Sequence, residues 1–254
     1  MAGVKGLVMK KIYDLKKKLN LNYLDLTNKT TCFGKLGLPR LTCNTNFKPD
    51  YIALSGQPCD YFRTKNTIVA FNEYDCAFNG KNGLYYSIYF KDKKNLEKLK
   101  QKYNKVKYFI MPDISIFGDI QAYENHHRMG QAREIALWLN LENKSVVIPF
   151  VGCGSRADFQ YMIEGLEDVS VVAFSTKGKV SNEIETKLLI DTIKYTVDNL
   201  KKLKRIIVYD VCKDNSYVNT TFKYAKEKGI DIVVPNNMLK IRNQVKSLGT
   251  CMEV

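Results

Sequence analysis

The sequence predicts an α/β fold built on a mainly parallel sheet with helices on both faces. Short apolar runs alternate with longer segments in which apolar residues recur at helical spacing, a pattern typical of parallel sheets. With 254 residues, 45% of them hydrophobic, the chain is long enough to bury a full core. About seven strands are expected from the apolar runs. That number fits either an incomplete TIM-like barrel or an open doubly wound sheet.

The first 50 residues are expected to form an extension of the main fold. Met9, Ile12 and Leu15 recur at helical spacing beside several lysines, which predicts a short basic helix. A loop rich in Thr, Asn and Gly follows. No repeat or Pro/Ser-rich linker divides the rest of the chain, so residues 51–254 are predicted to form a single α/β domain.

The expected elements of this domain alternate along the chain. Strands are expected at Tyr51–Leu54, Thr67–Phe71, Tyr108–Met111, Val146–Phe150, Val169–Phe174, Ile206–Tyr209 and Ile232–Val234. Helices are expected at Asn95–Tyr103, from Asp119 to Asn140, and at Asp158–Leu166, Glu183–Leu203 and Tyr217–Lys228. Asn182 is the expected cap of the fourth of these helices, and Gly229 closes the fifth.

The charge is strongly positive, with 40 Lys and Arg against 26 Asp and Glu and a formal net charge of +14. Runs of lysine attract phosphate backbones because binding releases counterions. The expected nucleic-acid contacts are Lys16, Lys17, Lys18, Lys93, Lys94 and Lys98. The alternative is a lysine-rich composition in which solvated lysines simply replace arginines.

The spacing of the cysteines and the length of the apolar runs indicate in which compartment the protein works and which cofactors it could bind. The seven cysteines are scattered and contain no CxxC pair, which predicts reduced thiols and a cytoplasmic protein. No apolar run reaches about 18 residues, so no membrane partner is expected. Two histidines and no close-spaced ligand pairs argue against zinc. Carboxylates near the strand ends leave a divalent metal open as a cofactor.

Ligands of parallel α/β folds bind beyond the carboxyl ends of the strands, so residues there are candidates for a site. The candidate catalytic residues are Asp113, Asp119, Arg128, Arg133 and Asp210. The candidate ligand-binding residues are Glu73, Asp75, Asn125, Ser155, Arg156, Ser175, Thr176 and Lys177. Asp113, Arg133, Ser175 and Asp210 are predicted to face one cavity.

Structural roles compete with these functional ones. Asp113 would otherwise serve its own loop, and Asp119 would cap the following helix. Glu124 and Arg128 stand at i and i+4, the spacing of a surface ion pair. Ser155 and Asp158 have the spacing of a capping box. Cys153 is predicted to be a buried thiol rather than a nucleophile.

The stretches PDISIFGDIQAYENHHRMGQAREIALWLN, VVIPFVGCG and VSVVAFSTKG resemble an uncharacterised family of firmicute bacteria, plasmids and phages that is known as a domain of unknown function. The matching residues are Pro112, Asp113, Ser115, Phe117, Asp119, Asn125, Arg128, Arg133, Pro149, Ser175, Thr176 and Gly178. The chain departs from the family where Val151-Gly152-Cys153 replaces a tryptophan and where Asp210 replaces a glycine. The resemblance implies a mobile-element context but no activity.

Three functions follow as expectations. The first is a phage- or plasmid-type protein that contacts nucleic acid through its lysines, in replication or host take-over. The second is an enzyme acting on a phosphorylated small molecule or a nucleotide at the strand ends. The third is an interaction protein that inhibits a host factor, its positive charge attracting an acidic partner.

Overall fold

The computed structural model describes residues 24–249 and contains two parallel sheets in that range. The first has the spatial order β10 (Asn236–Asn237), β3 (Tyr51–Leu54), β4 (Thr67–Ala70), β5 (Tyr108–Ile110) and β6 (Val146–Ile148). The second has the order β7 (Val171–Ser175), β8 (Arg205–Tyr209) and β9 (Asp231–Val233). An antiparallel pair, β1 (Cys32–Phe33) and β2 (Leu38–Pro39), precedes them. The predicted parallel α/β class is confirmed.

The two parallel sheets meet beyond the end of β6. Phe150 forms a parallel bridge with Ala173, whose backbone N–H donates to the carbonyl of Pro149 at 2.8 Å. β9 and β10 are successive segments of the chain on either side of Val234 and Pro235: β9 pairs with β8 in one sheet, and β10 pairs with β3 in the other. The strands follow chain order from β3 to β6 and from β7 to β9, without the reversal of a doubly wound sheet, and the last strand, β10, lies beside β3. Within the described residues, the parallel strands therefore form two sheets and not one closed barrel.

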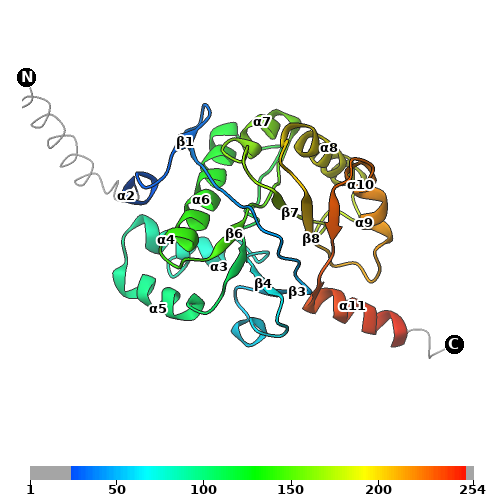
Figure 1. Ribbon diagram of the computed structural model, residues 1–254, viewed down its shortest axis with the longest axis horizontal. Coiled ribbons are helices and arrows are strands. Elements are labelled where there is room, and N and C mark those ends of the chain that lie inside the picture. The colour runs from blue at the N-terminus through cyan, green and yellow to red at the C-terminus, as the bar shows by residue number, and fades with distance from the viewer. Residues whose placement is uncertain (1–23, 250–254) are drawn as a thin grey trace, which may run out of the picture.

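Helices cover the sheets (Figure 1) and connect successive parallel strands from β4 to β9, while α11 follows the last strand. They are α3 (Cys76–Asn79), α4 (Leu84–Tyr89), α5 (Lys93–Tyr103), α6 (Ala122–Leu141), α7 (Phe159–Ile163), α8 (Glu183–Asn199), α9 (Ser216–Thr221), α10 (Lys223–Glu227) and α11 (Met238–Gly249). Smaller elements are α2 (Leu24–Thr27) and the 3-10 turns η1 (Pro58–Asp60) and η2 (Arg156–Asp158). No helix in this part of the chain has both the length and the apolar character needed to cross a membrane.

The core explains why these segments form strands. Every residue of β7 is buried, as is most of β4, and such continuous apolar runs are typical of strands covered on both faces. Leu41 and Cys43, from the segment before β3, pack into the same core. At the start of α8, Asn182 Oδ1 accepts the backbone N–H groups of Ile184 and Glu185, so the predicted helix cap is confirmed.

Several helix boundaries differ from the sequence-based expectation. Helix α6 begins at Ala122 rather than at Asp119, because the preceding residues form a loop tied to the helix by Asn125. The helix expected to run to Leu166 ends at Ile163, just before Gly165 takes a φ of 74°. The helix expected from Tyr217 to Lys228 is divided at Phe222, whose side chain is fully buried. The predicted helix around Met9 lies outside the described residues.

Candidate functional site

A cavity of about 370 Å³ lies beyond the carboxyl ends of four consecutive strands, β4 to β7. The polar residues that line it include Asn72, Glu73, Asp113, Ser175, Lys177 and Lys179. The apolar residues that line it include Ile114, Ile116, Phe117, Phe150, Leu188 and Leu189. A concave site of this size, with a few polar groups set among apolar ones, is the usual form of a small-molecule site. We call it the rim cavity.

Asp113 is the rim-cavity carboxyl with the most perturbed ionisation. It follows β5, and its Oδ2 accepts a 3.1 Å hydrogen bond from the side-chain amide of Asn72, which follows β4. Burial raises the pKa of Asp113 to about 6, and Asp75 acts in the same direction. The positive charges of Lys179 and Lys177 and the bond from Asn72 oppose this rise without cancelling it.

Lys177 and Lys179 reach the rim cavity from a tight turn after β7. The N–H of Lys179 donates to the carbonyl of Thr176 at 3.1 Å, and Gly178 takes the positive φ of 81° that this turn requires. The amine of Lys177 donates to the backbone carbonyl of Asn72 at 3.2 Å. The amine of Lys179 forms an ion pair with Glu185 at 3.3 Å. The turn therefore brings two amines to the same cavity as Asp113.

Glu73 is fixed at the edge of the cavity by the strand beside it. Its carboxylate accepts hydrogen bonds from the hydroxyl of Ser55 at 2.9 Å and from the N–H of Gly56 at 2.7 Å. Both donors follow β3, so the bonds join the ends of two paired strands. Cys153 also lines the cavity, where burial raises the pKa of its thiol to about 11. It is therefore protonated near neutral pH and is not an activated nucleophile.

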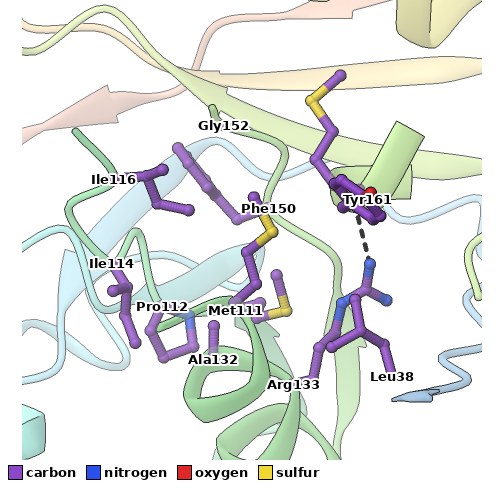
Figure 2. Close-up of a pocket in the computed structure, with 12 residues that line it drawn as sticks. Leu38, Met111, Pro112, Ile114, Ile116, Ala132, Arg133, Phe150, Gly152 and Tyr161 are labelled. Atoms are coloured by element: carbon purple, nitrogen blue, oxygen red, sulfur yellow. Dashed lines mark hydrogen bonds between the residues drawn. The ribbon is translucent and has the colours of Figure 1, made fainter. Parts of the chain in front are cut away.

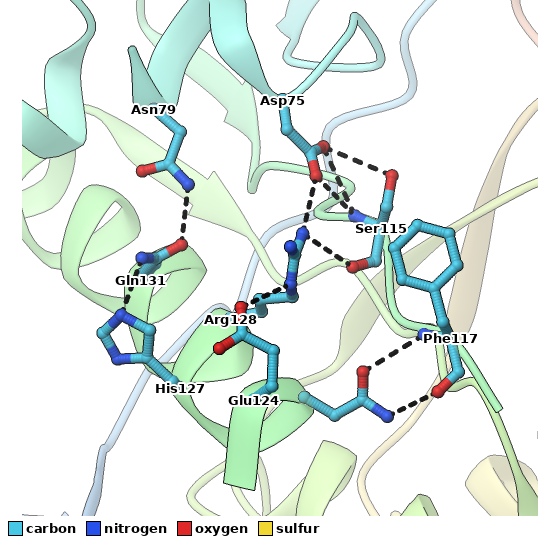
Figure 3. A network of polar contacts seen from close by, with 9 residues as sticks. Asp75, Asn79, Ser115, Phe117, Glu124, His127, Arg128 and Gln131 are labelled. Atoms are coloured by element: carbon cyan, nitrogen blue, oxygen red, sulfur yellow. Dashed lines mark hydrogen bonds and ion pairs between the residues drawn. The ribbon is translucent and has the colours of Figure 1, made fainter. Parts of the chain in front are cut away.

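A polar network braces the loop between β5 and α6 (Figure 3). Asp75 accepts a 3.1 Å ion-pair contact from Arg128 and also bonds the backbone N–H of Ser115. Arg128 forms the predicted pair with Glu124 at 3.1 Å. The side chain of Asn125 bonds both the N–H and the carbonyl of Phe117. Asp75, Asn125 and Arg128 thus position the cavity wall and do not line the cavity.

Arg133 does not face the rim cavity, contrary to the expectation from sequence. It lines a separate small cavity of about 30 Å³ with Met111, Phe150 and Tyr161. Its guanidinium donates to the backbone carbonyls of Met162 and Glu164 at 3.0 and 3.1 Å. Figure 2 shows it directed toward the segment that carries Tyr161. Burial lowers the pKa of Arg133 to about 10, and its role here is to join α6 to the C-terminal end of α7.

Asp210 is also absent from the lining of the rim cavity. It is fully buried and forms an ion pair with Lys240 at 3.0 Å, while its other oxygen accepts from the hydroxyl of Thr176 at 2.7 Å. Asn237 donates to its backbone carbonyl at 2.7 Å. These bonds hold α11 and the turn after β7 against the end of β8. Asp210 and Thr176 therefore stabilise the turn that carries Lys177 and Lys179 without lining the cavity themselves.

The remaining predicted residues lie at the surface. Asp119 is exposed in the loop before α6. Ser155 donates to the carboxylate of Asp158 through both its N–H and its hydroxyl, and exposed Arg156 pairs with Asp191. Lys93, Lys94 and Lys98 are exposed on α5. Lys16, Lys17 and Lys18 lie outside the described residues.

Asn72 and Lys179 are two of the rim-cavity residues that sequence reasoning missed. Asn72 directly follows a strand, and the rule used for Glu73 would have found it. Lys179 is in the same short turn as Lys177, and its alternation with Gly178 was the available signal. Between residues 24 and 249, no group of three or more His, Cys, Asp or Glu side chains is close enough to hold a metal ion.

Comparison with known protein families assigns the chain to a family. A family model described as Domain of unknown function (DUF4417) matches residues 31–227. The match runs from the antiparallel pair to α10 and includes the whole lining of the rim cavity. Comparisons with curated proteins and with solved structures found no match. The resemblance seen in the sequence is confirmed, and the chain belongs to the family described as Domain of unknown function (DUF4417).

Proposed function

We propose that the protein is an enzyme acting on a phosphorylated small molecule in the rim cavity, with Asp113 transferring a proton. One observation carries the proposal: a carboxyl whose pKa is raised to about 6 shares a cavity with two lysine amines. Perturbed carboxyls in clefts are characteristic of acid–base sites, because catalysis is most efficient when the pKa lies near the working pH.

Asp113 has suitable surroundings for this role. The bond from Asn72 fixes Oδ2 and so orients the carboxyl group. A pKa of about 6 leaves both protonation states accessible near neutral pH. Ionised Asp113 would accept a proton from the substrate, and protonated Asp113 would return one.

Lys177 and Lys179 are the groups proposed to bind the phosphate. An ammonium group has three N–H donors, so each amine retains donors beyond the bond it makes to Asn72 or to Glu185. Lysine binds phosphate as a point charge. Because bound phosphate would also favour the protonated form of a neighbouring carboxyl, the two parts of the site are electrostatically coupled.

The test is a binding and turnover screen of phosphorylated sugars and nucleotides. A compound that binds is expected to raise the Tm of the wild-type protein. Lys177→Gln should weaken its binding by roughly 10- to 100-fold, the effect of losing a charge-assisted contact. The control, Lys187→Gln, removes an exposed lysine of α8 outside the cavity and should bind normally.

Asp113→Asn separates binding from catalysis. It is expected to bind the same compound and to lower kcat by roughly 10²- to 10⁴-fold, the usual contribution of a general acid–base group. Turnover at the wild-type rate in Asp113→Asn, or failure of every phosphorylated compound to bind, would contradict the proposal.

Contact with nucleic acid is a second candidate, supported by the surface of α5. A groove of about 380 Å³ beside this helix is lined by Lys29, Lys91, Lys93 and Lys100, and Lys94 and Lys98 are exposed nearby. Glu97 and Glu142 reduce its positive charge. Affinity for single- or double-stranded probes that falls steeply with salt, and falls again in Lys93→Gln/Lys94→Gln, would support this candidate. No retardation of any probe at about 50 mM salt would exclude it.

A further inference from the structure

Phe117 is an exposed aromatic side chain that the fold holds in place at the rim cavity. Its ring is 46% exposed and lines the cavity together with Tyr74, which is 85% exposed. Single exposed aromatic residues are common on protein surfaces and need no explanation. What distinguishes Phe117 is the number of contacts that fix its backbone.

The first restraint is a two-point clamp from α6. Asn125 is only 3% exposed, and its Oδ1 accepts the N–H of Phe117 at 3.1 Å. Its Nδ2 donates to the carbonyl of the same residue at 2.7 Å. Both backbone polar groups of Phe117 are therefore satisfied by one buried side chain (Figure 3).

The second restraint is a close backbone contact between two loops. A Cβ added to Gly154 would lie 2.5 Å from the carbonyl carbon of Phe117, and one added to Gly118 would lie 2.6 Å from the carbonyl oxygen of Gly154. Only glycine at both positions lets the loop after β5 rest on the loop after β6. The loop that carries Phe117 is therefore held both by the side chain of Asn125 and by the backbone of Gly154.

Arg128 adds a charge to this arrangement. Its guanidinium lies over the ring of Phe117, 5.7 Å from the centroid. Asp75 and Glu124 hold the guanidinium in place, each at 3.1 Å. A cation over an aromatic ring is attracted by the π electrons. Arg128 therefore helps to fix the ring as well as the loop.

We propose that Phe117 is a stacking platform for the planar ring of the ligand, so that the substrate class is a nucleoside monophosphate. The proposal rests on the proposed function, because Lys177 and Lys179 would hold the phosphate. The ring would lie against Phe117 and Ile116, which line the same cavity. A rigid platform suits this task because little conformational entropy is lost when a flat base stacks on it.

The experiment compares AMP and UMP with ribose phosphate, which lacks the ring, by calorimetric titration of the full chain. In the wild-type protein, the two nucleotides are expected to bind about tenfold more tightly than ribose phosphate. Phe117→Leu should weaken nucleotide binding by roughly five- to tenfold, toward the affinity for ribose phosphate, and leave ribose phosphate binding unchanged. Phe117→Tyr, which keeps a ring, should restore nucleotide affinity.

Phe62→Leu is the matched control, since Phe62 is 62% exposed and does not line the cavity. It should alter no affinity. Equal binding of AMP, UMP and ribose phosphate by the wild-type protein would overturn the stacking proposal. So would an equal loss for all three compounds in Phe117→Leu. If ribose phosphate binding still depends on Lys177 in either case, the proposed function survives. If none of the three compounds binds, the stacking proposal fails, and the proposed function fails with it only if no phosphorylated compound of the screen binds.

Discussion

The side-chain amide of Asn72 and the carboxyl of Asp113 are joined by a 3.1 Å hydrogen bond across 41 residues of sequence. The register of β4 and β5, in which Ala70 pairs with Ile110, places both residues just beyond the ends of adjacent strands. The bond favours the ionised carboxyl, yet burial raises the pKa of Asp113 to about 6. The desolvation of this carboxyl is therefore only partly offset, which gives it a measurable effect on stability.

Asp113→Asn should change the pH dependence of stability. Because the folded-state pKa of about 6 lies above the ordinary value of 3.8, Asp113 destabilises the wild-type protein as the pH rises through this window. The variant cannot ionise there. Its free energy of unfolding, relative to wild type, should rise by on the order of 2 kcal/mol between pH values of about 4 and 7. Urea unfolding measures this difference. Asp119→Asn, at an exposed acid of the same loop, should show little change, and identical behaviour of the two variants would count against a raised pKa of Asp113.

Lys240→Met should be strongly destabilising. The Lys240 and Asp210 side chains are only 4% and 0% exposed, so the variant leaves a buried carboxylate without its cation. We expect a loss of about 3–5 kcal/mol in the free energy of unfolding. The double variant with Asp210→Asn should lose less than the sum of the two single losses. Lys223→Met, which breaks an exposed pair, should cost under about 0.5 kcal/mol. A small effect of Lys240→Met would show that the pair is solvated.

Gly154→Ala tests the contact between the two cavity loops. The added Cβ would meet the backbone of Phe117, which cannot move aside as a flexible side chain would. We expect a loss of roughly 1–3 kcal/mol in unfolding free energy and weaker nucleotide binding. Gly130→Ala is the opposite case: it lies within α6 with nothing within 4 Å of the new Cβ. It should stabilise the protein by roughly 0.5–1 kcal/mol. Equal effects of the two substitutions would refute the close approach.

Arg133→Met should affect stability and not ligand binding. The substitution leaves the carbonyls of Met162 and Glu164 without the guanidinium that now donates to both. A loss of about 1–3 kcal/mol in unfolding free energy is expected from these unsatisfied acceptors. Affinity for a phosphorylated compound should remain within about twofold of wild type. A selective loss of affinity with unchanged stability would instead show that Arg133 takes part in ligand binding.

Local patterns predicted those parts of the site that depend on strand ends. Asp113, Ser175 and Lys177 line one cavity because the carboxyl ends of parallel strands meet at one edge. The predicted placement of Arg133 and Asp210 in this cavity was wrong, because the positions of their side chains depend on partners that are distant in the sequence. The carbonyls that Arg133 binds lie 29 and 31 residues away, and Lys240 lies 30 residues beyond Asp210. No spacing rule within a helix or strand encodes such contacts.

The same limit applies to Phe117. Its exposure is unremarkable by itself, and the clamp from Asn125 becomes visible only when the loop and α6 are placed together. The fold class was easier to predict, because the alternation of apolar strands with helices is a property of the local sequence.

The most direct measurement of the central claim is the titration of the Asp113 carboxyl carbon by NMR, with and without ribose phosphate. We predict a midpoint near 6 for the free protein. The midpoint should rise further when the compound binds, because a negative phosphate at Lys177 and Lys179 disfavours ionisation of the neighbouring carboxyl. A midpoint near the ordinary value of 3.8 that the compound leaves unchanged would contradict the account.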